Sequence, residues 1–272
     1  MFIVFAEEII LQQVIKAKRY VSLWIETSFK IPTMKIALLG YGKMGQEIAK
    51  AAPSFGAEIV AVIDNPGDWE IKNSEVDSAN VAIEFSVPSA APDNIRRCFQ
   101  RNKPIVVGTT GWYDQFDDLA KQCREENQTL FYATNFSIGM QMLFALNKKL
   151  ARWMSEQTAY EPHIEEIHHV KKLDAPSGTA ITLAENLMEN YTLKTSWVNH
   201  PTQKPQELAV LSQREGSVPG IHRVIYDSAI DTISLQHSAK SRQGFAFGAL
   251  KAAEYCLSHH GVLTMDDLLN LS

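Results

Sequence analysis

The chain has 272 residues, of which 45% are hydrophobic and 21% charged, and its formal net charge is −5 at pH 7. This length suits one large or two modest domains, and the composition is that of an ordinary globular protein. The acidic balance gives no reason to expect nucleic acid as a partner, because nucleic-acid binders usually present a basic face. No apolar run approaches the ~20 residues that cross a bilayer, so we do not expect a membrane protein.

The three cysteines, Cys98, Cys123 and Cys256, lie far apart and form no CxxC pair. An odd number of isolated cysteines argues against a disulfide framework and against a zinc site. We therefore expect no metal, semi-buried free thiols and a reducing compartment, which here means the cytoplasm.

The first 33 residues differ in character from the rest of the chain. They begin apolar, but a secretory signal would place its positive charge before the apolar stretch and would end in small residues. Charged side chains instead appear early, at Glu7, Glu8, Lys16, Lys18 and Arg19. We interpret residues 1–33 as an upstream extension of uncertain structure, with Met34 opening the folded protein. A short amphipathic packing helix is the alternative.

From Met34 onward, short apolar runs alternate with helical patterns. The apolar runs predict strands at residues 35–39, 58–63, 81–85, 104–107 and 129–133. Helices are predicted between them at residues 43–52, 88–102 and 113–127. Pro88 falls near the first turn of one of these helices, where proline is tolerated. This βαβ rhythm predicts a parallel sheet covered by helices on both faces.

The rhythm changes after residue 136. Helices are predicted at residues 138–154 and 178–190, with a strand between them at residues 163–169. This strand-rich α+β segment predicts a second domain with a mixed or antiparallel sheet, and a last helix is expected to pack back on the first domain. The later elements are three extended runs at residues 208–213, 221–226 and 231–237 and a helix at residues 243–259.

A glycine-rich turn follows the first predicted strand and opens the first predicted helix. In such a turn the first glycine permits the bend, the second lets the backbone approach a pyrophosphate, and the third lets helix and strand pack closely. The helix N-terminus then attracts the phosphates. The pattern predicts a Rossmann-type dinucleotide site, with a plain glycine turn as the alternative. Its residues are Gly40, Tyr41, Gly42, Lys43, Met44 and Gly45.

Asp64 ends the second predicted strand, 19 residues beyond Gly45. A carboxylate at this place accepts hydrogen bonds from the adenosine ribose, and it would repel a 2′-phosphate. Asn65 follows where an NADP-preferring enzyme often carries arginine. We therefore expect NADH or NADPH as cofactor, with NADH binding at least as well as NADPH.

Polar loops close the later strands of the predicted parallel sheet. Ligands of such folds lie at the carboxyl ends of the strands, so these loops are expected near the nicotinamide half of the cofactor. Plain connecting loops are the alternative. The residues concerned are Phe85, Ser86, Gly108, Thr109, Thr110, Asn135 and Phe136.

The segment between Glu166 and Ala180 concentrates two histidines, two lysines and an aspartate just before a predicted helix. Ser177 can cap that helix, and the free N–H groups of Gly178 and Thr179 would point at an anion. Lysine adds positive charge, and histidine supplies a proton near neutral pH. The segment predicts a site that binds a carboxylate and supplies a proton. Structural histidines and a solvated lysine pair are the alternative.

The same segment resembles the signature of the dihydrodipicolinate reductases, E-x-H-H-x-x-K-x-D-A-P-S-G-T, at every defined position. The resemblance begins at KIALLGYGKMG, directly after Met34, and extends to about the C-terminus. It includes VVGTTG at residues 106–111 and ATNFSIG at residues 133–139. Residues 1–33 are not covered. Further matching positions are residues 214–216, 220–222, 237, 241–242 and 245–246.

The resemblance implies a role for each residue of the proposed site. His168 would be the proton donor or acceptor, with Lys172 as its partner. His169, Gly178 and Thr179 would bind the substrate. The implied cofactor contacts are Gly40 to Gly45, Asp64, Gly108, Thr109, Thr110, Ala133, Thr134, Asn135, Phe136 and, from the second domain, Arg242.

The resemblance also implies an α/β fold of two domains. Residues 34–136 and 243–272 would form the dinucleotide-binding domain, and residues 137–242 the substrate-binding and oligomerisation domain. The implied assembly is a homotetramer joined through the sheets of the second domain.

The implied reaction converts (2S,4S)-4-hydroxy-2,3,4,5-tetrahydrodipicolinate, a small dicarboxylate, to tetrahydrodipicolinate with loss of water. This is a step of lysine biosynthesis by the diaminopimelate route. Two alternatives remain open at this point. One is another two-domain NAD(P)-dependent dehydrogenase, acting on a semialdehyde or a sugar, and the other is a nicotinamide-sensing protein without turnover.

Overall fold

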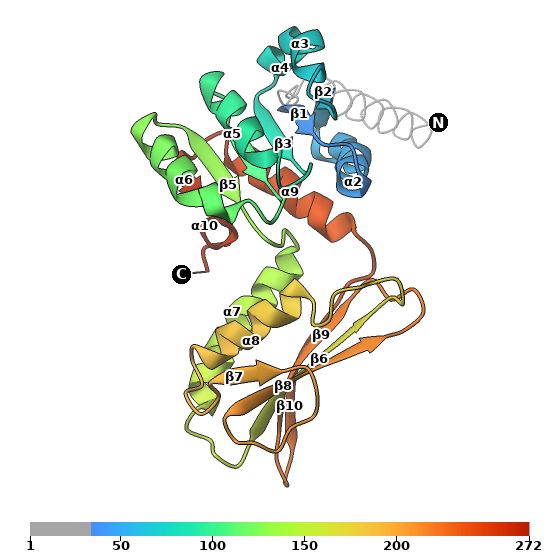
Figure 1. The fold of residues 1–272 in the computed structure, drawn as a ribbon, viewed down its shortest axis with the longest axis vertical. Coiled ribbons are helices and arrows are strands. Elements are labelled where there is room, and N and C mark those ends of the chain that lie inside the picture. Colours follow the sequence, from blue (N-terminus) through green and yellow to red (C-terminus); the bar gives the residue numbers. More distant parts are fainter. Residues whose placement is uncertain (1–33, 272) are drawn as a thin grey trace, which may run out of the picture. The chain divides into compact units, whose positions relative to one another are not determined.

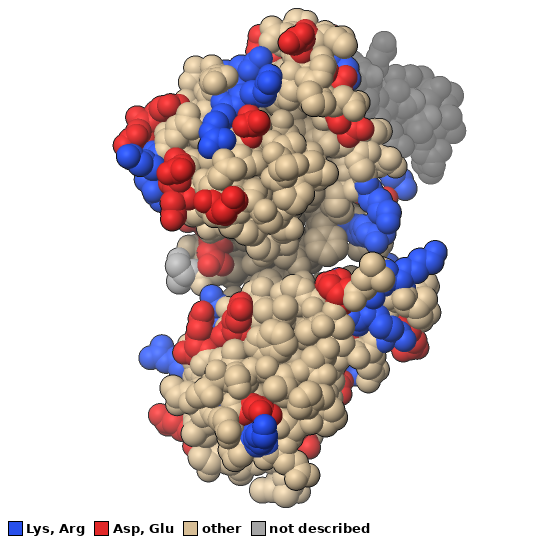
Figure 2. Space-filling model, in the orientation of Figure 1, with Lys and Arg blue, Asp and Glu red and all other residues tan. Residues whose placement is uncertain are grey.

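The computed structural model describes residues 34–271, so the expectation for residues 1–33 lies outside the described part (Figure 1). The described residues fold around two β-sheets. None of the described helices has the length and apolar character needed to span a bilayer. On the face visible in Figure 2, lysine and arginine side chains are interspersed with aspartate and glutamate.

The first sheet has six strands in the order β11-β5-β4-β3-β1-β2. β1, β3, β4, β5 and β11 run parallel to one another. All four residues of β3 are buried, because helices cover both faces of the sheet, as the continuous apolar runs predicted. The strands are β1 Met34–Leu39, β2 Ala57–Ile63, β3 Val81–Glu84, β4 Ile105–Val107, β5 Thr129–Tyr132 and β11 Gly261–Leu263.

Helices α2 and α9 pack together on one face of this sheet, and α5 and α6 on the other (Figure 1). On the face covered by α5 and α6, the apolar sides of these helices meet the strands in one core, with Trp69, Phe99 and Trp112 among its large members. The helices around the first sheet are α2 Lys43–Ala51, α3 Asp68–Ile71, α4 Asn73–Ser78, α5 Ala91–Gln100, α6 Phe116–Glu125, α9 Gln243–Tyr255 and α10 Met265–Leu269, with 3₁₀ turns η1 Ala52–Phe55 and η2 Tyr113–Gln115.

The C-terminal segment returns to the first sheet after the second sheet is complete. Helix α9 contacts α2, β3 and β4, and β11 pairs with β5 in parallel. This short edge strand was not predicted, because three residues are too few to show a period.

Two parts of the first sheet differ from the sequence predictions. Helices α3 and α4 occupy the connection after β2, where no element was predicted. The helix predicted from Pro88 begins at Ala91, and the proline in its first turn is Pro92. The connection folds because Asp68 accepts hydrogen bonds from the backbone N–H groups of Asp64 and Asn65, at 2.8 and 2.9 Å.

The three cysteines are free, as predicted, but they are fully buried rather than semi-buried. Burial raises the pKa of Cys98 and of Cys256 to about 12. A thiol with so high a pKa is a poor nucleophile, so these side chains serve the core.

The second sheet has five strands in the order β10-β9-β6-β8-β7. β6 pairs with β8 in parallel and with β9 in antiparallel fashion, so the sheet is mixed. Helices α7 Ile138–Met154 and α8 Gly178–Met188 pack on one face of it (Figure 1). The strands are β6 Glu161–His168, β7 Ser196–Val198, β8 Glu207–Arg214, β9 Ile221–Asp227 and β10 Thr232–Ser238, of which the short β7 was not predicted.

Candidate functional site

The glycine turn after β1 is held tightly against the loop after β3. Gly40 has φ +91°, and a Cβ there would lie 2.5 Å from the carbonyl oxygen of Phe85. A Cβ on Gly45 would lie 2.3 Å from the carbonyl oxygen of Gly40. Both positions therefore require glycine, the first for its backbone conformation and the second for the close approach. The predicted reasons for these two glycines agree with the geometry.

The mouth of the turn is open where a phosphate is expected. Gly42 is the N-cap residue of α2, and no side chain caps this helix. A Cβ on Gly42 would meet nothing within 4 Å. The uncapped N–H groups of the first turn of α2 are therefore available to an anion, which fits the pyrophosphate of a dinucleotide.

Asp64, directly after β2, faces the glycine turn. One of its carboxylate oxygens accepts a hydrogen bond from the backbone N–H of Tyr41 at 2.7 Å. Asp68 braces the backbone of Asp64 from below, and these backbone hydrogen bonds lower the pKa of Asp68. Asp64 therefore stabilises the turn through one carboxylate oxygen, which leaves the other oxygen for a ligand in the cavity.

Two cavities border the glycine turn. The larger, of about 540 Å³, lies on the Asp64 side, and the smaller, of about 400 Å³, lies between the turn and the later loops. The predicted residues in the larger cavity are Gly40, Tyr41, Gly42, Asp64, Phe85 and Ser86. Those in the smaller are Gly42, Lys43, Met44, Phe85, Ser86, Gly108, Thr109 and Thr110.

Three predicted cofactor residues, Gly45, Ala133 and Phe136, line neither these two cavities nor the third cavity, described below. Gly45 lies under the turn, and the N–H of Ala133 donates to the carbonyl of Val107 at 3.2 Å. The ring of Phe136 is buried, with its centroid 5.7 Å from that of Phe85. These residues support the loops rather than forming the cavity walls.

A buried carboxylate that the sequence did not single out ties two of the loops together. Glu84, the last residue of β3, is fully buried. It accepts hydrogen bonds from the hydroxyls of Ser86 and Thr109 and from the amide of Asn94. Burial raises the pKa of Glu84, although these hydrogen bonds act in the opposite direction. One side chain thus connects the loop after β3 with the loop after β4.

A third cavity, of about 640 Å³, brings together predicted residues from both sheets. Its first-sheet side consists of Thr110, Thr134 and Asn135. The opposite side carries the complete predicted catalytic and substrate-binding set together with the remaining cofactor residue. These are His168, His169, Lys172, Gly178, Thr179 and Arg242.

The N-terminus of α8 opens into this cavity. The hydroxyl of Ser177 caps the helix by accepting a hydrogen bond from the N–H of Ala180 at 3.3 Å, as predicted. A Cβ on Gly178 would meet nothing within 4 Å. The space before the first amides of α8 is therefore open to an anionic group. The hydroxyl of Thr179 accepts a hydrogen bond from the Asn135 side chain at 3.4 Å.

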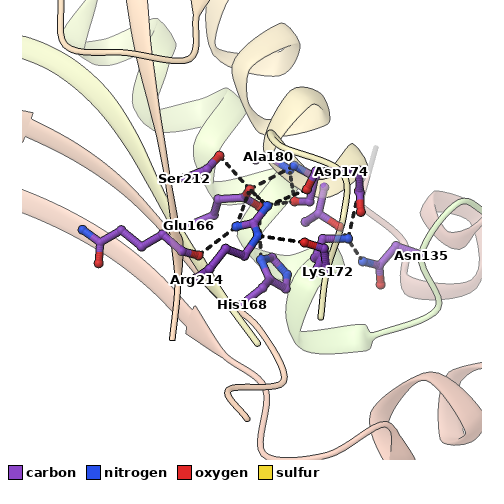
Figure 3. A network of polar contacts seen from close by, with 11 residues as sticks. Asn135, Glu166, His168, Lys172, Asp174, Ala180, Ser212 and Arg214 are labelled. Atoms are coloured by element: carbon purple, nitrogen blue, oxygen red, sulfur yellow. Dashed lines mark hydrogen bonds and ion pairs between the residues drawn. The ribbon is translucent and has the colours of Figure 1, made fainter. Parts of the chain in front are cut away.

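Glu166, on β6, is the centre of a polar network under the cavity floor (Figure 3). Its carboxylate is fully buried and accepts hydrogen bonds from the backbone N–H and hydroxyl of Ser177 and from the hydroxyl of Ser212. Arg214 approaches it to 3.4 Å, and Nδ1 of His168 to 3.3 Å. Burial alone would raise the pKa of Glu166, but the close His168 ring and the hydrogen bonds from Ser177 and Ser212 hold it far below its usual range.

His168 and Lys172, the residues predicted to handle a proton, lie beside this network. The His168 ring meets the ring of His222 edge-on, with centroids 5.0 Å apart. Burial, followed by the charge of His168, lowers the pKa of His222 to about 4, so His222 is neutral near pH 7. Nζ of Lys172 lies 2.9 Å from the carboxylate of Asp174, and this bond lowers the pKa of Asp174.

Glu166, His168 and His222 each offer a ligand atom within 4.8 Å of the others, which is a possible metal arrangement. The carboxylate, however, already accepts several hydrogen bonds, and the guanidinium of Arg214 beside it would repel a cation. The donor set therefore suits the handling of protons better than the binding of a metal ion.

Several residues of the site received no role from the sequence alone. Some of them become visible only through their burial, and the others only through the contacts and the cavity that the fold creates. His222 and His237 also line the cavity. A Cβ on Gly220 would lie 3.1 Å from Nε2 of His168. The residues without an assigned role were Glu84, Asn94, Glu166, Ser212, Arg214, His222 and His237.

Two family models match the chain. The model for the N-terminus of dihydrodipicolinate reductase covers residues 34–136, and that for the C-terminus covers residues 139–269. Together they match most of the chain.

Curated relatives bear the name 4-hydroxy-tetrahydrodipicolinate reductase. The protein of Christiangramia forsetii is 45% identical over 238 residues, which is 87% of this chain and 98% of the relative. The protein of Staphylococcus aureus strain MRSA252 is 35% identical over 250 residues, 86% of this chain and all of the relative. Among solved structures, the dipicolinate-bound dihydrodipicolinate reductase of Paenisporosarcina sp. TG-14 aligns with a TM-score of 0.71 at 22% identity, covering 85% of this chain and 97% of that one.

Proposed function

The chain belongs to the dihydrodipicolinate reductase family, and from this premise we propose that it is a 4-hydroxy-tetrahydrodipicolinate reductase of the diaminopimelate route to lysine. It reduces the hydroxylated cyclic dicarboxylate to tetrahydrodipicolinate, with loss of water, using NADH or NADPH. The single observation that carries this proposal is the third cavity, where the open N-terminus of α8, the imidazole of His168 and the ammonium of Lys172 face the loops of the first sheet.

The first sheet fits a nicotinamide dinucleotide. The uncapped turn at Gly42 suits the pyrophosphate, and Asp64 suits the adenosine ribose. When bound, this cofactor supplies a hydride to the substrate ring. Thr110, which lines both the smaller cavity and the third cavity, marks the place where cofactor and substrate would meet.

The residues of the second sheet bind the substrate and handle a proton. The amides of Gly178 and Thr179 receive a substrate carboxylate at the N-terminus of α8, and His169 and Lys172 add donors beside it. Nδ1 of His168 lies 3.3 Å from the buried carboxylate of Glu166, which orients the imidazole ring. Nε2, on the opposite side of the ring, faces Gly220 on the cavity wall and is the atom that exchanges a proton.

The roles of the individual residues follow the same division. His168 is the acid or base, Lys172 its partner, and His169, Gly178 and Thr179 bind substrate. Arg242 lines the third cavity and approaches the cofactor from beyond the second sheet. Residues 34–136 and 243–272 act as the cofactor-binding part, and residues 137–242 as the substrate-binding part.

The outer face of the second sheet supports assembly. Ile167, Ile221 and Ile225 alternate with buried residues along β6 and β9 and remain partly exposed on the face away from α7 and α8. A second copy of the chain would cover these apolar side chains. We place the enzyme in the cytoplasm as a homotetramer joined through this face. Light scattering on the purified protein measures the assembly, and Ile225→Lys is expected to lower the mass.

A spectrophotometric assay tests the reaction. The absorbance of NADH is followed with freshly generated 4-hydroxy-tetrahydrodipicolinate and, separately, with unrelated aldehydes. Oxidation with the cyclic dicarboxylate alone supports the reductase, and dipicolinate, which is bound in the Paenisporosarcina structure, is expected to compete with the substrate. Turnover only with aldehydes would identify another dehydrogenase, and NADH binding without turnover would identify a sensor.

A further inference from the structure

The cavity beside Asp64 contains a positively charged side chain that comes from a helix. Arg97, on α5, lines the same cavity of about 540 Å³ as Asp64 and Asn65. In dinucleotide-binding folds, the acidic residue after the second strand binds the ribose hydroxyls of NADH, whereas a nearby arginine accommodates the 2′-phosphate of NADPH. Position 65 provides no arginine, so the cationic group comes from a different element.

A buried tryptophan holds Arg97 in this position. The guanidinium carbon lies 5.4 Å from the centroid of the Trp69 ring. Trp69 is itself fixed, because it is 4% exposed and its indole N–H donates to Asn94 at 3.3 Å. A guanidinium stacked on an aromatic face keeps its N–H groups free for an anion.

Two other arginines at α5 show what is distinctive about Arg97. Arg96 pairs with Asp93 at 3.6 Å, and Arg101 pairs with Asp77 at 3.5 Å. Within the described part of the chain, no carboxylate lies within ion-pair distance of Arg97. Arg101 also stacks on the Trp69 ring, at 5.3 Å, but it does not line the cavity. The positive charge of Arg97 is therefore both unpaired and directed to the cavity.

The remaining charges of this cavity are negative. Asp64 and Asp93 line it, and Asp93 is already paired with Arg96. Asp64 has one oxygen bound to the N–H of Tyr41, and its charge opposes a phosphate on the ribose. Without a cation, this cavity would accept the dinucleotide with free ribose hydroxyls and reject the phosphorylated one.

We propose that Arg97 is the specificity-determining residue that binds the 2′-phosphate of NADPH and lets this chain use both nicotinamide cofactors. The inference rests on the proposed function, in which this cavity holds the adenosine half of the cofactor. It assigns the two preferences to two residues, Asp64 for the ribose hydroxyls and Arg97 for the phosphate.

Titration of the full-length protein with each cofactor tests this assignment. The dissociation constants of NADH and NADPH are measured by the change in cofactor fluorescence for the unchanged protein, Arg97→Met and Arg101→Met. Methionine keeps an unbranched apolar side chain on the indole ring and removes the charge. Arg101→Met is the matched control, since it removes a guanidinium from the same ring outside the cavity.

The expected result is selective. Arg97→Met raises the dissociation constant of NADPH by about tenfold, the scale of a lost charge-assisted hydrogen bond, and that of NADH by less than about twofold. Arg101→Met leaves both constants unchanged. The unchanged protein loses affinity for NADPH more steeply with added salt than affinity for NADH, and Arg97→Met removes this difference.

Other outcomes separate the inference from the proposed function. Equal losses for both cofactors in Arg97→Met, or equal effects of Arg97→Met and Arg101→Met, would overturn the role of Arg97 and leave the reductase assignment intact. Tight binding of NADH with no measurable binding of NADPH would do the same. If the unchanged protein bound neither cofactor, the proposed function itself would fail.

Discussion

The two sheets each bury one glutamate near the carboxyl end of a strand, and the pKa values of the two carboxylates are shifted in opposite directions. Glu84 on β3 and Glu166 on β6 are both fully buried. The donors around Glu84 are neutral hydroxyl and amide groups, and burial raises its pKa. Around Glu166, the contact with His168 and the hydrogen bonds from Ser177 and Ser212 outweigh burial, and its pKa is lowered. Two fully buried acids therefore have pKa values shifted in opposite directions, according to the polar groups around each carboxylate.

This difference separates two kinds of site. In the first sheet, Glu84 connects loops whose surface binds a cofactor, and no proton needs to move there. In the second sheet, Glu166 connects the capping residue of α8 with an imidazole, so the anion-binding helix and the proton-exchanging group share one carboxylate. Variants around the two carboxylates test this difference.

The largest effect is expected at the proton-handling site. His168→Ala and Lys172→Ala each remove a group that the first sheet cannot replace, so turnover should fall by ~10² to 10⁴, the usual contribution of general acid–base catalysis. The dissociation constant of NADH should stay unchanged, because neither residue lines the cavities beside the glycine turn. Steady-state kinetics and NADH titration measure the two quantities. Near-normal turnover in both variants would remove the assigned roles.

Glu166→Gln should have the next largest effect, on stability. It leaves Arg214 facing a neutral amide, and breaking a buried charged pair costs about 3 kcal/mol. The folded-state pKa of Glu166 is lowered, so its ionised form stabilises the fold above the unfolded-state value of about 4.3, and this contribution is lost as the pH falls through the folded-state value. Urea unfolding from pH 7 downward should show that Glu166→Gln weakens this acid-side dependence.

A matched pair of hydroxyl deletions separates the two carboxylates by function. Thr109→Val removes a donor to Glu84 and frees the loop after β4, so the free energy of unfolding should fall by about 1 to 2 kcal/mol and NADH should bind more weakly. Ser212→Ala removes a donor to Glu166 and should leave NADH binding unchanged. The distinction between the two sites would be lost if both variants weakened NADH binding equally.

The long helices and strands and the residues of the signature could be predicted, because each of these features shows as a pattern of neighbouring residues in the sequence. The apolar runs of β1 and β5 and the signature around His168 are contiguous in the chain. The short elements α3, β7 and β11 have three or four residues, too few for a period to appear.

Residues that support the site without lining a predicted motif could not be predicted, because their importance depends on tertiary packing. Glu84 precedes Phe85 in a predicted strand, and only the packed sheet shows that its carboxylate is fully buried beneath two loops. Arg97 lies 33 positions after Asp64, and only the packing of α5 places both in one cavity. Such residues can be suspected as charges within apolar patterns, but the sequence does not say what they contact.

Glu84→Gln should have the smallest effect and is the most direct test of the contrast. Because the folded-state pKa of Glu84 is raised, stability is present below the unfolded-state value and is lost as the pH rises toward and through the folded-state value. A neutral amide of the same shape avoids this loss, so at pH 7 the free energy of unfolding should change by less than about 1 kcal/mol, with an increase the favoured direction. Urea unfolding at pH 5 and pH 8 measures the slope. If Glu84→Gln destabilised the protein at pH 8 as strongly as Glu166→Gln does, Glu84 would hold a charge that the fold requires.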